Sequence, residues 1–132
     1  QNLVFCNDID PYAVQITKLN IEYLFPELAF NIKCDDGLEL KWNQKFDFII
    51  TNPPYGIKHK HHTLKTTEIF SQFIYSSLFQ YLNHDGIMNF VLPSSVLDVS
   101  KHKEIRKIIL DQFSLERIKF YGKRNNTNFT KI

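Results

Sequence analysis

FDFIITNPPYG, residues 46–56, is the stretch that decides the fold expected for this chain. Its first part is a continuous apolar run, of the kind that is buried on both faces in a parallel β-sheet. Two consecutive prolines follow. Because proline fixes φ and offers no N–H, Pro53-Pro54 forms a stiff turn that donates nothing. A stiff turn behind a buried strand indicates a site that has to hold its shape.

Apolar runs and helix signals alternate on both sides of this stretch. The runs predict strands at residues 2–6, 30–34, 46–51, 87–92 and 115–121. Asp10-Pro11 is an N-cap followed by proline at the first helical position, which predicts a helix that stops near Pro26. A second helix is predicted over 67–82 and ended by Asp85-Gly86, and a third is capped by Ser100. The apolar face of the second helix consists of Phe70, Phe73, Ile74, Leu78 and Tyr81.

This alternation predicts an α/β fold with an open, doubly wound parallel sheet and right-handed crossovers. In such sheets ligands bind beyond the carboxyl ends of the strands. The segments found there are rich in carboxylates and amides; they are residues 7–10, 35–37, 52–56 and 93–95.

Composition favours one globular domain, because 43% of the 132 residues are hydrophobic and 14% are aromatic. The net charge of +2 does not suggest nucleic-acid binding by the molecule as a whole, so a basic surface would be local. No apolar run approaches the ~18 residues of a membrane span, and no secretory signal is present. Cys6 and Cys34 lie in predicted strands and are interpreted as reduced core residues of a cytoplasmic protein.

The turn NDIDP, residues 7–11, places acids just beyond the first strand. In doubly wound folds an acid here bonds the ribose hydroxyls of a nucleotide-like cofactor, which makes Asp8 the candidate, with Ile9 as an apolar surface for an adenine ring. Asp10 has the simpler role of helix cap. The alternative, of about equal weight, is that both aspartates only shape the turn.

The turn CDDG, residues 34–37, follows the second strand. An acid here would accept a hydrogen bond from an exocyclic amine of a cofactor base. Asp35 is the better placed and Asp36 is the reserve. Taken alone, a plain turn before Gly37 is the stronger interpretation.

The NPPY stretch suits methyl transfer to an amine attached to an aromatic ring. The lone pair of such a nitrogen is delocalised, so two acceptors aimed at its N–H bonds would align the lone pair with a methyl donor. The Asn52 side-chain oxygen and the Pro53 carbonyl are the candidate pair, Tyr55 would stack on the flipped base, and Pro54 would keep the turn rigid. The alternative is a rigid strand exit with a packed tyrosine.

Basic residues gather in KHKHHTLK, residues 58–65, which is predicted to be a solvated loop, with phosphate contact as the second interpretation. His59, His61 and His62 have no acid or cysteine alongside, so no metal site is expected. The cationic residues of the third helix are predicted to form its solvated face; they are Lys101, His102, Lys103, Arg106 and Lys107.

Taken together, FDFIITNPPYG, NDIDPYAV, CDDG and GIMNFVLPSSVL resemble the class I S-adenosylmethionine-dependent methyltransferases, and most of all the N6-adenine DNA methylases of restriction-modification systems. The resemblance covers about residues 2–110. It implies that Asp8 binds the cofactor ribose, that Asp35 contacts the cofactor adenine, and that the catalytic motif is Asn52, Pro53, Pro54 and Tyr55. The segment GIMNFVLPSSVL would shape the target-base side.

In that family a glycine-rich cofactor loop lies upstream of both acids when the motifs have this order. The four glycines here are isolated, at positions 37, 56, 86 and 122. Residues 1–122 are therefore expected to be the C-terminal part of a catalytic domain whose sheet lacks its first strand, and residues 123–132 a loose polar tail. A rearrangement of the sheet or a second copy of the chain would fill the gap.

The leading function is transfer of a methyl group from S-adenosylmethionine to an adenine swung out of DNA. The same motif serves relatives that methylate an RNA base or a protein glutamine, and a third interpretation is an inactive fragment or interaction module. Expected partners are DNA and a specificity or restriction subunit or domain. The sequence gives neither the DNA recognition site nor an associated nuclease.

Overall fold

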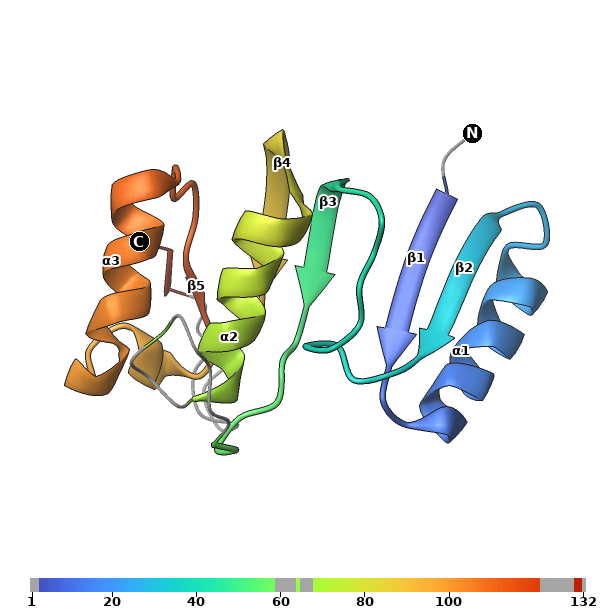
Figure 1. Cartoon of the computed structure of the whole chain (residues 1–132), viewed down its shortest axis with the longest axis horizontal. Helices are drawn as coiled ribbons and strands as arrows, with labels where there is room; N and C mark the ends of the chain where they lie inside the picture. Colours follow the sequence, from blue (N-terminus) through green and yellow to red (C-terminus); the bar gives the residue numbers. More distant parts are fainter. Residues whose placement is uncertain (1–2, 59–63, 65–67, 122–129, 132) are drawn as a thin grey trace. The chain divides into compact units, whose positions relative to one another are not determined.

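The computed structural model describes residues 3–58, 64, 68–121 and 130–131, and divides the chain into two compact units. Unit 1 is Gln1–Gln44 and unit 2 is Lys45–Ile132. Figure 1 labels the helices and strands of both units. Each unit pairs two parallel strands and is described by itself.

Unit 1 is built from β1 (Leu3–Asp8), α1 (Pro11–Leu24) and β2 (Ala29–Cys34). The two strands are parallel and in continuous register, and α1 packs along the pair (Figure 1). The predicted start of the helix is confirmed, because the Tyr12 amide donates to Asp10 Oδ1 over 2.8 Å and Pro11 is the first helical residue.

Little of unit 1 is buried. Among its described residues, Leu40 is the one buried hydrophobic side chain, and α1 has no buried residue. Both cysteines are free thiols, Cys6 half-buried and Cys34 exposed. The predicted core position of Cys34 is therefore wrong. Helix α1 covers β2 on one side only, and Cys34 is the last residue of β2, at the exposed end of the strand.

Unit 2 contains the pair β3 (Phe46–Thr51) and β4 (Leu82–Phe90), which are also parallel. Between them lie α2 (Ile69–Ser76) and a π-helical turn, η1 (Ser77–Tyr81). Two short 3₁₀ turns, η2 (Ser94–Val96) and η3 (Ser100–His102), lead into α3 (Lys103–Gln112). The chain then forms β5 (Lys119–Phe120), which pairs with β6 (Thr130–Lys131) in antiparallel orientation.

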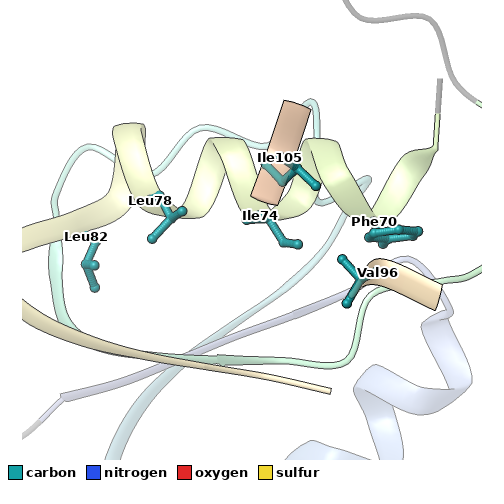
Figure 2. Packing of buried hydrophobic residues seen from close by; sticks show 6 residues of the cluster. All are labelled: Phe70, Ile74, Leu78, Leu82, Val96 and Ile105. Atoms are coloured by element: carbon teal, nitrogen blue, oxygen red, sulfur yellow. The ribbon is translucent and has the colours of Figure 1, made fainter. Parts of the chain in front are cut away.

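The core of unit 2 lies where α2, α3 and the β3–β4 pair meet. Figure 2 shows its buried apolar side chains, which come from α2, η1, β4, η2 and α3; they are Phe70, Ile74, Leu78, Leu82, Val96 and Ile105. Ile49 of β3 and Met88 of β4 pack against this cluster. Burial of this continuous apolar surface is the main stabilising term for unit 2.

The second helix ends earlier than predicted. Regular α-helix stops at Ser76, the π-helical turn stops at Tyr81, and β4 begins at Leu82. Asp85-Gly86 therefore lies within β4 and does not end the helix. The residues 83–86 stand opposite the single residue Asp47 in a β-bulge, which the Asn83 side chain closes by donating to Asp47 Oδ1 over 2.6 Å.

The predicted α/β class is confirmed, and the sheet is shown in part. The described strands form three two-stranded pairs, two of them parallel, and do not show a complete doubly wound sheet. The last strand of the prediction, over 115–121, is reduced to β5. Of the tail, Thr130–Lys131 forms β6 and the remaining residues lie outside the described part.

Two residues assigned to the solvated face of the third helix are placed differently. His102 is only 1% exposed, and its ring lies 4.9 Å from that of Phe70. Arg106 is half-buried and donates 2.8 Å hydrogen bonds from Nη1 to the carbonyls of Val96 and Val99. Both side chains turn inward because the backbone of η2 and η3 folds over the start of α3. Lys101, Lys103 and Lys107 are exposed as predicted.

Within the described ranges, the structure contains no helix with the length and apolar character needed to cross a bilayer.

Candidate functional site

The candidate cofactor residues of unit 1 come together at the carboxyl ends of β1 and β2. The Asp35 amide donates to the Asp8 carbonyl over 3.1 Å, which extends the strand pairing by one step into the turns. Asn7 bonds the same turn through its side chain, with Nδ2 3.0 Å from the Asp35 carbonyl oxygen. Parallel pairing thus places the two acidic turns side by side.

Each acid is held by a bond within its own turn. Asp8 Oδ1 accepts from the Asp10 amide, Asp35 Oδ1 from the Asp36 amide, and Asp36 Oδ1 from the Leu38 amide, all at 2.9 Å. The bonds of Asp8 and Asp36, to the amide two residues on, are Asx turns, which aspartate forms readily at strand exits, whereas Asp35 bonds the amide of the next residue. In the described part of the chain, no donor contacts Oδ2 of these carboxylates, so this oxygen is open to a ligand.

Exposure also suits a binding role for these residues. Asp8 and Asp35 are exposed, Asp36 is half-buried, and Ile9 is 68% exposed beside them. The Ile9 carbonyl lies 3.7 Å from Cys34 Sγ, which connects the two turns a third time. A ribose needs carboxylate oxygens and an adenine ring needs an apolar surface, and both are present at this strand end. The residues therefore fit a nucleoside-type cofactor such as S-adenosylmethionine.

The NPPY turn follows β3 directly. Thr51 is the last strand residue, and its carbonyl accepts from the Val91 amide over 3.1 Å, so the exits of β3 and β4 stay together. Pro53 is buried, whereas Asn52 and Pro54 are exposed. The buried first proline fixes the turn against unit 2, while Asn52 beside it is an exposed residue.

Tyr55 closes this turn on itself. Its hydroxyl oxygen lies 2.5 Å from Asn52 Oδ1 and 2.7 Å from the Val91 carbonyl oxygen. Its ring is 42% exposed and meets the buried Phe70 edge-on, with ring centroids 6.5 Å apart. Burial raises the pKa of the Tyr55 phenol above its usual value, which keeps the group protonated at neutral pH.

Asn52 and Tyr55 are both exposed, as their predicted roles require, and Asn52 Oδ1 accepts from the Tyr55 hydroxyl. The Asn52 side chain does not enter the core, and one part of the Tyr55 ring is open to solvent. Their roles in catalysis, like those of Pro53 and Pro54, stay predictions. Gly56 follows with φ at +72°, a left-handed conformation that glycine adopts without strain, so it turns the chain away from the site.

Three residues of these turns carry contacts that the sequence interpretation missed. Asn7 lies in the segment identified after the first strand, but nothing in the sequence indicated that its side chain would bond to the second turn. Phe70 was assigned to the core and also supports Tyr55. Val91 acts through its backbone, for which a sequence offers no signal at all.

Of the basic loop, residues 58–65, only Lys58 and Leu64 are among the described residues. Lys58 forms an isolated antiparallel bridge with Glu68, and Leu64 is buried. His59, His61 and His62 lie outside the described residues. Among the residues that are described, no group of three His, Cys, Asp or Glu side chains is arranged to hold a metal ion.

Comparison with known proteins shows that the chain matches the model of a protein family. The model of the Eco57I restriction-modification methylase family matches residues 22–127, which include the second acidic turn and the whole NPPY turn.

Curated relatives carry names of the same kind. The modification methylase CviBIII of Paramecium bursaria Chlorella virus NC1A is 38% identical over 100 residues, 70% of this chain and 26% of that protein. The type II methyltransferase M.VspI of Vibrio sp. (strain 343) is 26% identical over 119 residues, 81% of this chain and 29% of that protein. A release factor glutamine methyltransferase of Clostridium acetobutylicum is 39% identical over 54 residues, 39% of this chain and 19% of that protein. The chain thus spans less than a third of the length of each.

Proposed function

The chain belongs to the Eco57I restriction-modification methylase family, and from this premise we propose that the protein transfers a methyl group from S-adenosylmethionine to the exocyclic N6 amine of adenine in DNA. The observation that carries the proposal is the NPPY turn, in which an exposed amide and a half-exposed tyrosine follow a parallel strand on a rigid, partly buried Pro-Pro pair. The names of CviBIII and M.VspI support a DNA substrate.

Residues 1–122 are proposed to form part of the catalytic domain. In this proposal β1–β2 and β3–β4 belong to one Rossmann-like sheet, completed by a strand that the described residues do not supply. A specificity or restriction subunit or domain and the DNA itself are the proposed partners. Such an enzyme would act in the cytoplasm, where the DNA and the cofactor are found.

The acidic turns of unit 1 would hold the cofactor. Asp8 would bond the ribose hydroxyls through the carboxylate oxygen that its own turn does not use. Asp35, with Asp36 as the reserve, would accept from the exocyclic amine of the cofactor adenine, and Ile9 would lie against that ring. When bound, S-adenosylmethionine supplies an electrophilic methyl group on a positively charged sulfur.

The NPPY turn would prepare the target nitrogen for that methyl group. Asn52 Oδ1 and the Pro53 carbonyl oxygen would each accept one N–H of the adenine amine and orient the nitrogen lone pair. As the nitrogen takes the methyl group from the cofactor sulfur, it would gain positive charge, which the two oxygens would stabilise until one N–H proton left to solvent. Tyr55 would stack on the flipped base.

The decisive experiment measures methyl transfer by the complete natural protein. It is incubated with S-adenosylmethionine labelled in the methyl group and with DNA of mixed sequence, and the DNA is then digested to nucleosides. Label in N6-methyladenine is the expected result. Asn52→Ala should lower the rate about 100- to 1000-fold, the usual loss when one stabilising contact to developing charge is removed. Asn20→Ala is the matched control, because Asn20 is an exposed asparagine on α1 with no role in the proposed reaction.

Two results would contradict the proposal. Label in cytosine, or in no DNA base at all, would exclude adenine methylation. Full activity of Asn52→Ala would show that the amide has no catalytic role.

Methylation of a protein glutamine is the second candidate. The 39% identity to a release factor glutamine methyltransferase over 54 residues favours it, and a glutamine amide is another planar nitrogen that two carbonyl acceptors could hold. The same assay with RNA and with release factor as substrates distinguishes these reactions. An inactive protein would label none of the three.

A further inference from the structure

Two carbonyl oxygens meet at the Tyr55 hydroxyl. Asn52 Oδ1 is 2.5 Å and the Val91 carbonyl oxygen 2.7 Å from the phenol oxygen. A phenol has a single proton, so it donates to one of these oxygens only. The other contact is then a close approach of two oxygens with no proton between them, which is unfavourable.

Rotation of the Asn52 amide removes this conflict. The oxygen and the NH₂ group of an asparagine have nearly the same size, so a half-turn about Cβ–Cγ exchanges them without a steric cost. Nδ2 then donates to the phenol oxygen, and the phenol donates to the Val91 carbonyl. Both contacts then join a donor to an acceptor, the Asn52 contact becoming a hydrogen bond once it lengthens into the ordinary N–H···O range, and Oδ1 is released from the phenol.

We propose that the Tyr55 hydroxyl is a positioning group for Asn52: held by the Val91 carbonyl, it binds the amide nitrogen and so presents the amide oxygen to the substrate amine. This inference rests on the function proposed above. With the amide reversed, Nδ2 would point its hydrogens at the hydrogens of the substrate nitrogen, and the lone pair would lose one of its two acceptors.

The relay from Asn52 through Tyr55 to Val91 is attached to rigid structure at each step. The Val91 amide donates to the Thr51 carbonyl over 3.1 Å, so the carbonyl that receives the phenol proton belongs to the paired strand exits. The Tyr55 ring rests on Phe70, which is 2% exposed. The two prolines fix the path between Asn52 and Tyr55.

The test uses Tyr55→Phe in the complete natural protein, because phenylalanine keeps the ring and removes only the hydroxyl. The first measurement is NMR of the protein labelled with ¹⁵N-asparagine, with the Asn52 side-chain signals assigned by their loss in Asn52→Ala. In the wild-type protein one Nδ2 proton should be shifted downfield and exchange slowly. Both properties should be lost in Tyr55→Phe and kept in Tyr23→Phe, whose tyrosine is 85% exposed on α1.

The second measurement is the single-turnover rate of methyl transfer. Tyr55→Phe should lower it about tenfold, the effect of one hydrogen bond. Extrusion of the target base, followed by 2-aminopurine fluorescence at the target position, should not change, because the stacking ring remains. A structural defect would instead lower both together.

Each outcome decides between the two proposals. Unchanged Asn52 amide signals in Tyr55→Phe would overturn the relay, whether or not the protein methylates DNA. Released amide signals with an unchanged transfer rate would overturn the positioning role while the proposed function stands. Released signals in a protein that labels no DNA would support the relay and refute DNA as the substrate.

Discussion

The polar turn of unit 2 is attached to a buried core, whereas the polar turns of unit 1 are held by hydrogen bonds among their own residues. The Tyr55 ring packs against Phe70, a member of the core cluster, and its hydroxyl contacts the Val91 carbonyl just beyond strand β4. In unit 1, Asp8, Asp35 and Asp36 each bond a backbone amide one or two residues away. Local bonds place acids in a turn, but fixing an aromatic ring requires contacts from distant parts of the chain.

This difference suits the chemistry proposed for the two units. A cofactor that is bound and released after each turnover needs oxygens of suitable spacing, which short Asx turns supply. A reacting nitrogen has to be aligned more closely, because a small displacement of the acceptors costs rate. The predictions below test how far the comparison holds.

The largest expected effect comes from the same substitution made in both units. Ile74→Ala in α2 should lower the free energy of unfolding by about 2–5 kcal/mol, because Ile74 is 0% exposed and its removal leaves a cavity. Ile16→Ala in α1 should change it by less than about 0.5 kcal/mol, because Ile16 is 60% exposed. Urea denaturation of the complete natural protein measures both. A large loss for Ile16→Ala would mean that another part of the protein covers α1, and would break the comparison.

The next effect concerns the acid proposed to bind the ribose. Asp8→Asn keeps an oxygen for the Asp10 amide but removes the charge, so the affinity for S-adenosylmethionine should fall about tenfold or more, as expected for a hydrogen bond to a charged group. Isothermal titration calorimetry measures it. Asp10→Asn is the matched control, since asparagine caps a helix as well as aspartate does. Equal losses in the two variants would argue against a ribose contact by Asp8.

His102 predicts a dependence of stability on pH that belongs to unit 2. Burial lowers the pKa of this imidazole, and the Lys101 charge lowers it further, with Arg106 in the same direction and Glu68 and Asp98 opposing. The unfolded chain therefore binds the proton more readily than the folded chain. Stability should be complete above the ordinary histidine pKa of about 6.5 and decline as the pH falls from there toward the lowered value.

His102→Leu tests this prediction by thermal unfolding at a series of pH values. The variant should lose the decline below about pH 6.5. It should also gain about 1–3 kcal/mol near pH 7.5, because both ring nitrogens of His102 are buried with no hydrogen-bond partner among the described residues. His84→Gln, at a fully exposed histidine of β4, should keep the decline. If stability still declined with falling pH in His102→Leu, another group would be the cause of the decline.

The smallest effect concerns a cap in unit 1. Asp10→Ala should destabilise α1 by about 1 kcal/mol, because it removes the acceptor of the Tyr12 amide. Asp10→Ser restores a capping oxygen and should be close to neutral. Hydrogen exchange of the α1 amides separates this local loss from global unfolding, and a uniform increase in exchange across both units would show that they unfold together.

Sequence reasoning worked where a few neighbouring residues decide the structure. Asp10-Pro11 starts α1, FDFIIT forms β3, and the prolines follow Asn52 directly behind that strand. The burial of β3 on both faces was predicted wrongly for the described part of the chain, because Ile49 packs against the core cluster while Phe48 is 58% and Ile50 69% exposed. The alternation of elements predicted that Asp8 and Asp35 follow two strands, but only the structure shows that these strands are neighbours.

The errors occurred where distant contacts decide. The helix over 67–82 was extended through Leu82 because its apolar spacing continues, yet Leu82 is taken up by β4, whose bulge is closed by the bond from Asn83 to Asp47. His102 stands among lysines and was assigned to solvent, but η2 and η3 bring it onto Phe70. Neither contact leaves a trace in the local pattern.

Val91 shows how a residue can hold a site together through its backbone alone. Its amide serves Thr51 and its carbonyl serves Tyr55, while its side chain is 50% exposed. Any amino acid except proline could supply both groups equally well. Sequence variation at this position would therefore not reveal its role. Side-chain substitutions would leave both hydrogen bonds in place, whereas an ester in place of the Val91 peptide N–H would remove the bond to Thr51.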